Sequence, residues 1–211
     1  MIQRVEVRDV FAENAYFFID PSTRQGFVID PGAEPERLFQ IIEQNGLDIQ
    51  AILLTHGHFD HTGAIPFLHE RLGVPYYISP PGEAYLTDPA LNLSQECGRY
   101  SVLTEAQFFK PGDFLSVPAN PRFGLEVIAT PGHTPDSVTL YSATENAAFV
   151  GDTIFKGSPG MTQFPGGNPR DLYASILNRI LTLPDATTLY SGHTPPTTVR
   201  EEKPAYRHMQ G

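Results

Sequence analysis

Cysteine is almost absent from this chain, which holds a single one, Cys97, among its 211 residues. One cysteine cannot form an intrachain disulfide, and it cannot build the cysteine-rich cluster of many structural zinc sites. We therefore expect Cys97 to be a buried or inert thiol, and we expect no zinc site made of cysteines.

Basic residues and long apolar runs are also scarce. The 14 Lys and Arg residues face 24 Asp and Glu residues, which leaves a formal charge of −10 at pH 7, and the basic residues form no cluster. This balance argues against nucleic acid or an anionic membrane as a partner. No apolar run reaches the roughly 18 residues of a transmembrane helix, and the N-terminal segment lacks the pattern of a signal peptide. The expected location is therefore the cytoplasm.

Glycine and proline are plentiful, at 18 and 20 residues, but they lie scattered between apolar segments and therefore mark turns. With 40% hydrophobic residues, the chain can bury a substantial core. We expect a single domain over residues 1–211, and the sequence leaves the oligomeric state open.

The first half of the chain predicts alternating strands and helices. Turn residues separate β-rich runs, and apolar residues recur at helical spacing between them. The predicted elements are a hairpin over 15–30, a helix within 33–46 that stops at Gly46, a strand over 49–55, a helix within 61–73 that starts near Pro66, and a strand over 74–79.

The second half begins with residues 80–110, where Pro, Gly and Asp break any long period and predict a helical or irregular insertion. Strands in both halves suggest two sheets, and the alternation favours α/β layering over an all-β sandwich. The remaining predicted elements are strands over 113–117, 124–130, 137–142, 146–152 and 187–193, and a helix over 170–184.

The segment "LLTHGHFDHTGA", residues 53–64, places His56, His58, Asp60 and His61 directly after an apolar strand, although the chain has only seven histidines. Imidazole and carboxylate groups are the ligands that Zn²⁺ and similar cations prefer. In an extended stretch, His56 and His58 project to the same side and can reach one metal. Asp60 and His61 follow a turn and can serve a second ion.

Three later strands also run into a potential ligand. "GLEVIATPGHT" leads into His133, "AAFVGDT" into Asp152 and "TTLYSGHT" into His193. A histidine by itself is more often a hydrogen-bonded or exposed residue, but the shared context of strand end, glycine and ligand favours metal binding. His69, within a predicted helix, and His208, in the tail, lack this context, and we expect both to be structural or exposed.

An H-x-H-x-D-H run followed by a separate His, an Asp and a last His at strand ends resembles the metallo-β-lactamase-fold superfamily of metallohydrolases. The resemblance covers essentially the whole chain. It implies an α/β fold, an αββα four-layer sandwich in which two mixed β-sheets are flanked by helices. The implied ligands are His56, His58 and His133 for a first metal, Asp60, His61 and His193 for a second, and Asp152 as the bridge.

The cofactors implied are two divalent metal ions. Zn²⁺ is the leading choice, and Fe or Mn are alternatives because sites rich in histidine and carboxylate accept them as well. Two such cations about 3.5–4 Å apart share a hydroxide that attacks a polarised carbonyl. Asp60 is a catalytic candidate because it can orient that hydroxide. Asp30, in "VIDPG", either positions a ligand histidine or forms the turn before Pro31.

Within the superfamily, "FVIDPG", "GDTIFKGSPGMTQFPGGN" and "SGHTPPTTVREEKP" resemble the glyoxalase II group of hydroxyacylglutathione hydrolases, which cleave thioesters of hydroxy acids. Longer members append a helical domain that helps to hold glutathione. Only 18 residues follow His193, so we expect the short form without that domain. The implied partner is a small-molecule thioester, and Lys156 is a candidate contact for its carboxylate.

Several positions depart from the glyoxalase II pattern. That group commonly has a G-R-T/S-D-F-P run, whereas this chain has Met161 and Gln163 in the places of the Arg and the Asp. If the missing pair formed a salt bridge, the change is structural; if it touched a substrate carboxylate, the specificity has changed. Asp136 and Thr194 stand where glycine is common.

Three alternatives remain open. A persulfide dioxygenase shares this fold but uses one iron held by two histidines and an aspartate, and the retention of all seven ligands argues against it. A second alternative is a hydrolase of lactones or other esters. The third, a metal-bearing binding protein without turnover, is disfavoured because the residues that generate hydroxide are intact.

Overall fold

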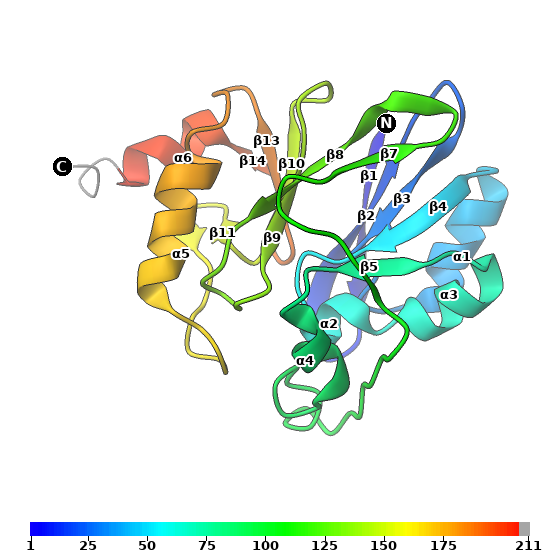
Figure 1. Ribbon diagram of the computed structural model, residues 1–211, viewed down its shortest axis with the longest axis horizontal. Helices are drawn as coiled ribbons and strands as arrows, with labels where there is room; N and C mark the ends of the chain where they lie inside the picture. Colours follow the sequence, from blue (N-terminus) through cyan, green and yellow to red (C-terminus); the bar gives the residue numbers. More distant parts are fainter. Residues whose placement is uncertain (207–211) are drawn as a thin grey trace.

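The computed structural model describes residues 1–206 and contains two six-stranded sheets and a small two-stranded one (Figure 1). The first sheet mixes antiparallel pairs at the N-terminal edge with parallel pairs from β3 onward. Its strands, in sheet order, are β1 (Ile2–Arg8), β2 (Ala12–Ile19), β3 (Gln25–Ile29), β4 (Asp48–Leu53), β5 (Tyr76–Ile78) and β6 (Gln107–Phe108).

The second sheet is also mixed, because β10 and β13 pair in parallel while their outer neighbours pair antiparallel. In sheet order its strands are β14 (Thr197–Thr198), β13 (Thr188–Ser191), β10 (Ala147–Gly151), β9 (Val138–Ser142), β8 (Asn120–Ala129) and β7 (Phe114–Val117). The two-stranded sheet consists of β11 (Ile154–Phe155) and β12 (Ser158–Pro159).

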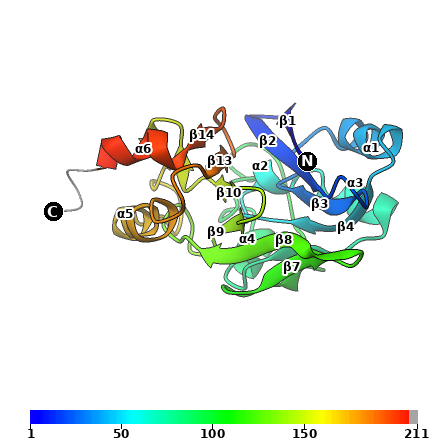
Figure 2. The ribbon, with the colours of Figure 1, turned by 90° about the horizontal axis from the view of Figure 1, so that it is seen from above.

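Helices cover the outer faces of both large sheets, as the view from above shows (Figure 2). The helices are α1 (Pro35–Gln44), α2 (Phe59–Thr62), α3 (Ile65–Leu72), α4 (Gly82–Thr87), α5 (Pro169–Ser175), the π-helical turn η1 (Ile176–Ile180) and α6 (Val199–Tyr206).

Strand β2 shows how the sequence builds the layers. Its side chains alternate between the two faces of the sheet, so Phe17 packs with residues of α1 and α3 while Phe18 packs between the sheets. There the Phe18 ring stacks on Phe123 of the second sheet with centroids 4.3 Å apart. On the far side, Leu172 and Ile176 of α5 and η1 pack on the outer face of the second sheet. The order is helix, sheet, sheet, helix, and the predicted four-layer α/β sandwich is confirmed.

Most predicted elements are present with shifted ends. The hairpin over 15–30 corresponds to β2 and β3, and the helix within 33–46 corresponds to α1. The helix predicted to start near Pro66 and to stop at Gly73 corresponds to α3, and the short helix α2 precedes it. The helix predicted over 170–184 ends earlier and changes to a π-helical turn, η1, after Ser175.

Some elements escaped prediction. The strand β1, the two-residue strands and the C-terminal helix α6, which contains Pro204, have no counterpart among the predicted elements. The segment 80–110 is a helical and irregular insertion as expected, with α4 as its helix, and only the two-residue strand β6 departs from the prediction. The predicted state of His208 lies outside the described residues. Among residues 1–206, no helix combines the length and the apolar character that crossing a membrane requires.

Candidate metal centre

The candidate ligands all follow the C-terminal ends of strands. The segment with His56, His58 and His61 follows β4 of the first sheet, whereas His133, Asp152 and His193 follow β8, β10 and β13 of the second. At His58 the backbone is extended, and it turns into α2 immediately afterwards. That turn separates His56 and His58 from Asp60 and His61, so the two pairs join different groups of ligands.

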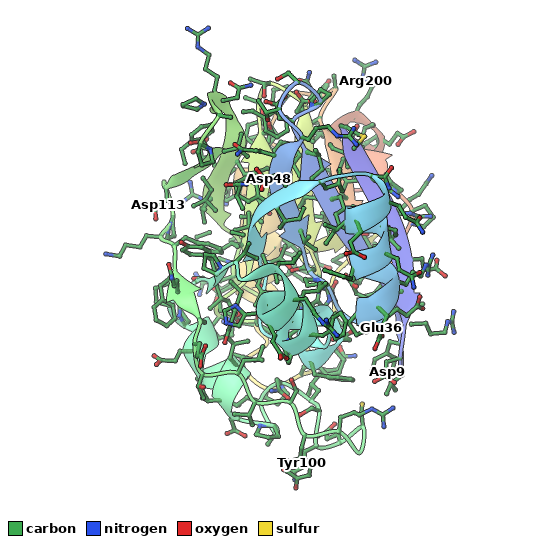
Figure 3. All side chains as sticks on the ribbon, turned by 90° about the vertical axis from the view of Figure 1, so that its right-hand side faces the viewer. Asp9, Glu36, Asp48, Tyr100, Asp113 and Arg200 are labelled. Atoms are coloured by element: carbon green, nitrogen blue, oxygen red, sulfur yellow. The ribbon has the colours of Figure 1, made fainter. Side chains whose placement is uncertain are left out.

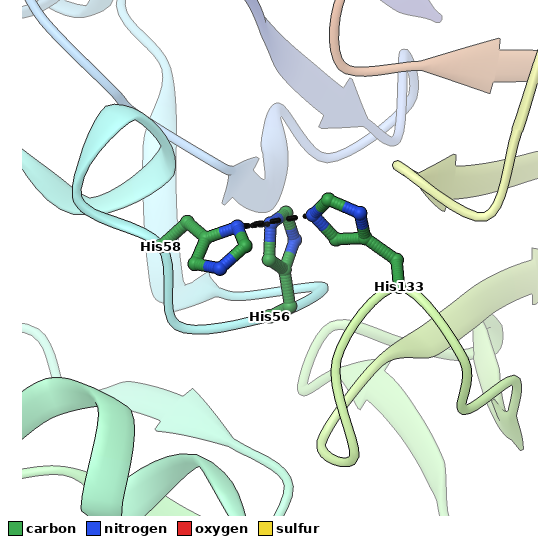
Figure 4. Close-up of side chains that lie close together, drawn as sticks. All are labelled: His56, His58 and His133. Carbon is green, nitrogen blue, oxygen red and sulfur yellow. Dashed lines mark hydrogen bonds between the residues drawn. The ribbon is translucent and has the colours of Figure 1, made fainter. Parts of the chain in front are cut away.

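Three imidazoles form the first group, shown in Figure 4. The Nδ1 atom of His58 lies 3.1 Å from Nε2 of His56 and 3.0 Å from Nε2 of His133. All three side chains are buried. Burial lowers the pKa of each of the three imidazoles below the usual range. Neutral imidazoles with converging nitrogens are the form that binds a cation.

Asp60, His61 and His193 form the second group, with ligand atoms close enough to hold one ion. The Nε2 atom of His193 lies 3.3 Å from Oδ2 of Asp60. Burial opposes the charged form of both histidines, but the neighbouring carboxylates, Asp152 first, outweigh it. They raise the pKa of His193 to about 11 and that of His61 well above its usual range. Without metal, ion pairs between the two histidines and the neighbouring carboxylates stabilise this group.

Asp152 lies between the two groups. Its Oδ1 atom is 3.6 Å from Nε2 of His61, and its Oδ2 atom is 3.2 Å from Nε2 of His193 and 3.7 Å from Nε2 of His133. Burial would raise the pKa of Asp152, but His193 and His61 outweigh it and hold the pKa well below its usual range. One ionised carboxylate therefore faces ligands of both groups.

Two observations show that these residues fit metal ions. The Nε2 atom of His61 and the Oδ1 atom of Asp152 are buried, and neither has a hydrogen-bond partner among the described residues. A Cβ atom on Gly192 would lie 2.4 Å from Oδ1 of Asp152 and 2.5 Å from Cε1 of His61, so only glycine leaves room there. Buried atoms without partners are costly, and a bound cation would satisfy both.

The outer nitrogens of the histidines are held by neighbouring groups, which fixes the direction of the inner ones. The Nδ1 atom of His133 donates to the carbonyl oxygen of Met161, and that of His193 to the carbonyl oxygen of Ala12, both at 2.7 Å. The Oδ2 atom of Asp30 lies 3.1 Å from Nδ1 of His61.

Asp30 also reaches a second histidine through Thr55. The Oδ2 atom of Asp30 accepts a hydrogen bond from the Thr55 hydroxyl at 2.6 Å. The Oγ1 atom of Thr55 in turn lies 3.2 Å from Nδ1 of His56. Of the two possibilities for Asp30, this geometry favours positioning a ligand histidine.

Sequence reasoning missed Glu13, which is buried behind the second group. Its Oε1 atom lies 3.8 Å from Nδ1 of His61, and neither carboxyl oxygen has a hydrogen-bond partner among the described residues. Burial raises the pKa of Glu13 well above its usual range, so the side chain is a neutral acid. A charged residue type next to the apolar run of strand β2 was the available signal.

A cavity of about 340 Å³ opens over both groups of ligands. Apolar side chains make up most of its wall, and Cys97 belongs to that wall. The lining residues that are not candidate ligands are Phe11, Ala12, Leu93, Glu96, Cys97, Met161 and Phe164.

Other residues singled out in the sequence lie apart from the ligands. His69 bonds the carbonyl oxygen of Val74 at 2.7 Å and is not part of either group. Lys156 does not line the cavity, and its backbone N–H donates to the Thr194 hydroxyl at 3.0 Å. Asp136 is buried, and both of its carboxyl oxygens are without partners among residues 1–206.

The fold and the site define a class of protein. Two mixed sheets face each other between helices, and His and Asp clusters suited to metal ions lie where strands of both sheets end. This is the architecture of a metal-dependent hydrolase.

The chain belongs to the metallo-beta-lactamase superfamily, whose family model matches residues 8–193. It is 38% identical to "Probable metallo-hydrolase YqgX" of Bacillus subtilis over 94% of this chain and 92% of that protein. It is 34% identical to "Hydroxyacylglutathione hydrolase GloC" of Haemophilus influenzae over 92% of this chain and 91% of the relative.

Solved structures agree with this assignment. The chain matches the BLEG-1 B3 metallo-beta-lactamase with a TM-score of 0.91 and 34% identity, and all of both chains is covered. It matches TTHA1623 in a di-iron-bound form with a TM-score of 0.84 and 35% identity, over 95% of this chain and 96% of that one. The His and Asp clusters and the di-iron relative together support the binding of divalent metal ions.

Proposed function

We propose that this protein is a binuclear metal-dependent hydrolase that cleaves a small thioester, of which S-2-hydroxyacylglutathione is the reference example. The observation that carries the proposal is the position of Asp152, whose carboxylate lies within 3.7 Å of His133 in the first group and of His61 and His193 in the second. A carboxylate placed in this way is suited to bridge two cations.

We assign His56, His58 and His133 to one ion and Asp60, His61 and His193 to the other, with Asp152 shared between them. When bound, two divalent cations lower the pKa of a shared water and polarise the carbonyl that is attacked. Zn²⁺ suits this mixture of imidazole and carboxylate, and the di-iron relative supports iron as the alternative.

The chain's own residues prepare the site for this reaction. Asp60 lines the cavity, and its hydrogen bond with His193 outweighs burial and lowers the pKa of its carboxyl. An ionised Asp60 can accept a hydrogen bond from the attacking water and hold it in line with the scissile carbonyl. The carbonyl oxygens of Met161 and Ala12 keep His133 and His193 in the tautomer that points Nε2 inward.

The choice of a thioester rests on the 34% identical relative named hydroxyacylglutathione hydrolase and on the motifs shared with that group. The match to a B3 metallo-beta-lactamase favours a second candidate substrate, the cyclic amide of a β-lactam. Both reactions need a nucleophilic water and a polarised carbonyl, so the same site serves either.

Two substitutions and one control test the proposal. His58→Ala and Asp152→Ala should lower kcat on S-lactoylglutathione by about a thousandfold or more, because each removes a ligand that the reaction requires. Both should also lower the metal content. His69→Ala, which alters a histidine outside both groups, should change neither quantity. Full activity in Asp152→Ala would contradict the two-metal assignment.

A parallel panel of thioesters, lactones, β-lactams and phosphodiesters tests the substrate class. The metal-loaded protein should turn over thioesters fastest. A clear preference for a β-lactam or a lactone would replace the thioester assignment while leaving the metal site unchanged.

A further inference from the structure

The wall of the cavity is the feature from which we draw a further inference. Phe11, Leu93, Met161 and Phe164 surround the opening above the ligand histidines. Phe164 packs edge-on against both His58 and His133, with ring centroids 5.8 and 6.0 Å apart. Phe11 and Met161 are each about half exposed, at 48% and 46%, so their apolar surfaces face an incoming substrate.

Outside the candidate ligands, the described residues that line the wall carry no positive charge. Among the described residues, the cavity is lined by no Lys or Arg side chain, whereas Glu96 adds a carboxylate to those of Asp60 and Asp152. Arg99, close to Glu96 in the sequence, is directed elsewhere, because its Nε and Nη2 atoms donate to the Asp9 carboxylate at 3.0 and 2.7 Å. Figure 3 shows Asp9 and Tyr100 at one end of the molecule.

The segment that carries Leu93, Glu96 and Cys97 is firmly held. The Nδ2 atom of Asn92 donates to the carbonyl oxygens of Tyr85 and Ser101, both at 2.9 Å. The backbone N–H of Phe59, within the ligand segment, donates to the carbonyl oxygen of Asn92 at 3.0 Å.

Leu93 itself has a φ of 68°, a strained conformation for a leucine, and its side chain is buried in the wall. Strain of this kind persists only where the surroundings enforce it. The apolar wall is therefore built before substrate arrives.

A wall of this kind discriminates between thioesters according to the charge of their thiol-derived portion. In a glutathione thioester the carbonyl is directed to the metals, so the two carboxylates and the single ammonium of glutathione, which together carry a net negative charge, must be met by other groups. Near Glu96 and without a Lys or Arg side chain in the wall, this net negative charge would meet like charge and apolar surface, and neither compensates the loss of hydration. A neutral thiol-derived portion loses little hydration on binding, and it gains contact with the aromatic and Met side chains of the wall.

We propose that this protein selects thioesters whose thiol portion is uncharged and apolar over the corresponding glutathione thioesters. The inference rests on the proposed function and narrows its substrate class. The carbonyl and its acyl group are directed to the metal centre, while Phe11, Met161 and Phe164 receive the thiol portion.

The test compares one acyl group on two thiols. The lactoyl thioester of neutral N-acetylcysteamine and S-lactoylglutathione are assayed with the same metal-loaded preparation, so the ratio of their kcat/KM values is independent of the active fraction. We expect the neutral thioester to be favoured by about tenfold or more. Equal values, or a preference for glutathione, would overturn the inference while leaving the thioesterase assignment intact.

Two variants connect the ratio to the wall. Met161→Arg adds a cation to the wall and keeps the carbonyl that orients His133, and Glu96→Gln removes the anion. Each should shift the ratio toward glutathione by several-fold. Phe114→Arg alters a half-exposed aromatic residue outside the cavity and should leave the ratio unchanged.

The outcomes separate the two proposals. If Met161→Arg and Glu96→Gln both leave the ratio unchanged, the charge of the wall does not determine which thioester is preferred, and the inference is wrong. If neither thioester is cleaved by the metal-loaded wild-type protein, the proposed function itself fails, and the inference fails with it.

Discussion

Asp152 lies between two groups of candidate ligands, each of which draws residues from both sheets. His56 and His58 follow β4 of the first sheet, whereas His133 and His193 follow strands of the second, and Asp152 touches histidines of both groups. Its Oδ2 atom lies near histidines of both groups, and its Oδ1 atom lies near His61 of the second. A carboxylate offers two anionic oxygens at this position, which an amide or a histidine could not supply.

Asp136 is a second buried carboxyl, and it has no metal ligand as a partner. Glycines surround it, since a Cβ atom on Gly82 would lie 2.9 Å from its Oδ2 atom and one on Gly57 would lie 3.5 Å away. Burial raises the pKa of Asp136 from 3.8 to about 6. The folded protein therefore binds the Asp136 proton more tightly than the unfolded chain does.

This shift predicts a pH-dependent effect of Asp136→Asn. Because the folded pKa is the higher one, ionisation of Asp136 destabilises the fold as the pH rises from about 4 through about 6. A neutral amide avoids that loss and should raise the free energy of unfolding by about 1–3 kcal/mol at about pH 8. Urea unfolding of chelator-treated wild type and variant should show the gap closing near pH 4. A variant less stable than wild type at every pH would refute the prediction.

At the scale of elements, the ligand loops depend on close contacts with helices. Gly132, just before His133, has a φ of +140°, and a Cβ atom there would lie 2.2 Å from the backbone nitrogen of Leu172 in α5. The backbone N–H of Asn168, the N-cap of α5, donates to the carbonyl oxygen of Gly132 at 2.8 Å. Helix α5 therefore fixes the path of the loop that carries His133.

Gly132→Ala should accordingly disturb both stability and metal binding. We expect a loss of about 1–3 kcal/mol in the free energy of unfolding, because the methyl group forces the loop away from α5. Gly112→Ala is a matched control, since Gly112 also has a positive φ, of 91°, but has no atom within 4 Å of a Cβ. A decrease in metal content should accompany Gly132→Ala alone. Equal effects of the two substitutions would assign the loss to backbone strain instead of the contact.

The sequence indicated which candidate ligands follow strands, but it did not predict several short or irregular elements. His133, Asp152 and His193 could be found because each follows an apolar strand and a glycine, and parallel or neighbouring strands bring such ends together. Helix α4 is only six residues long, which is too short for a helical period to emerge. Helix α6 contains Pro204, and a proline inside a segment predicts that a helix ends there.

The sequence could predict the candidate ligands and Asp30, but not most of the groups that orient the ligands. The groups that orient them, such as the carbonyl oxygens of Met161 and Ala12, belong to the backbone and carry no residue-type signal. Leu93 and Phe11 enter the cavity wall through tertiary packing of distant segments. The sequence therefore predicted which side chains are candidate metal ligands, and the fold was needed to describe what surrounds them.

At the scale of the whole molecule, metal binding is coupled to protons. Without metal, the raised pKa of His61 and the pKa of about 11 for His193 keep both imidazoles protonated at neutral pH. A cation must displace those protons before the imidazole nitrogens can coordinate it. The first group, His56, His58 and His133, has lowered pKa values and needs no such displacement.

Metal affinity should therefore rise with pH, and saturating the metal-free protein should release about two protons per chain near neutral pH. Calorimetric titration with Zn²⁺ in two buffers of different ionisation enthalpy measures that number directly. His193→Gln should lower it by about one proton. A binding enthalpy that does not depend on the buffer would contradict the assignment of His61 and His193 as ligands.

The central claim, that two cations share Asp152, is tested most directly by the metal stoichiometry of the purified protein. Elemental analysis should give about two ions per chain for the wild type and about one for His193→Ala, which removes a ligand of the second group only. One ion per chain in the wild type, unchanged by His193→Ala and accompanied by oxygen consumption with glutathione persulfide, would contradict the account and assign the site to one-iron chemistry.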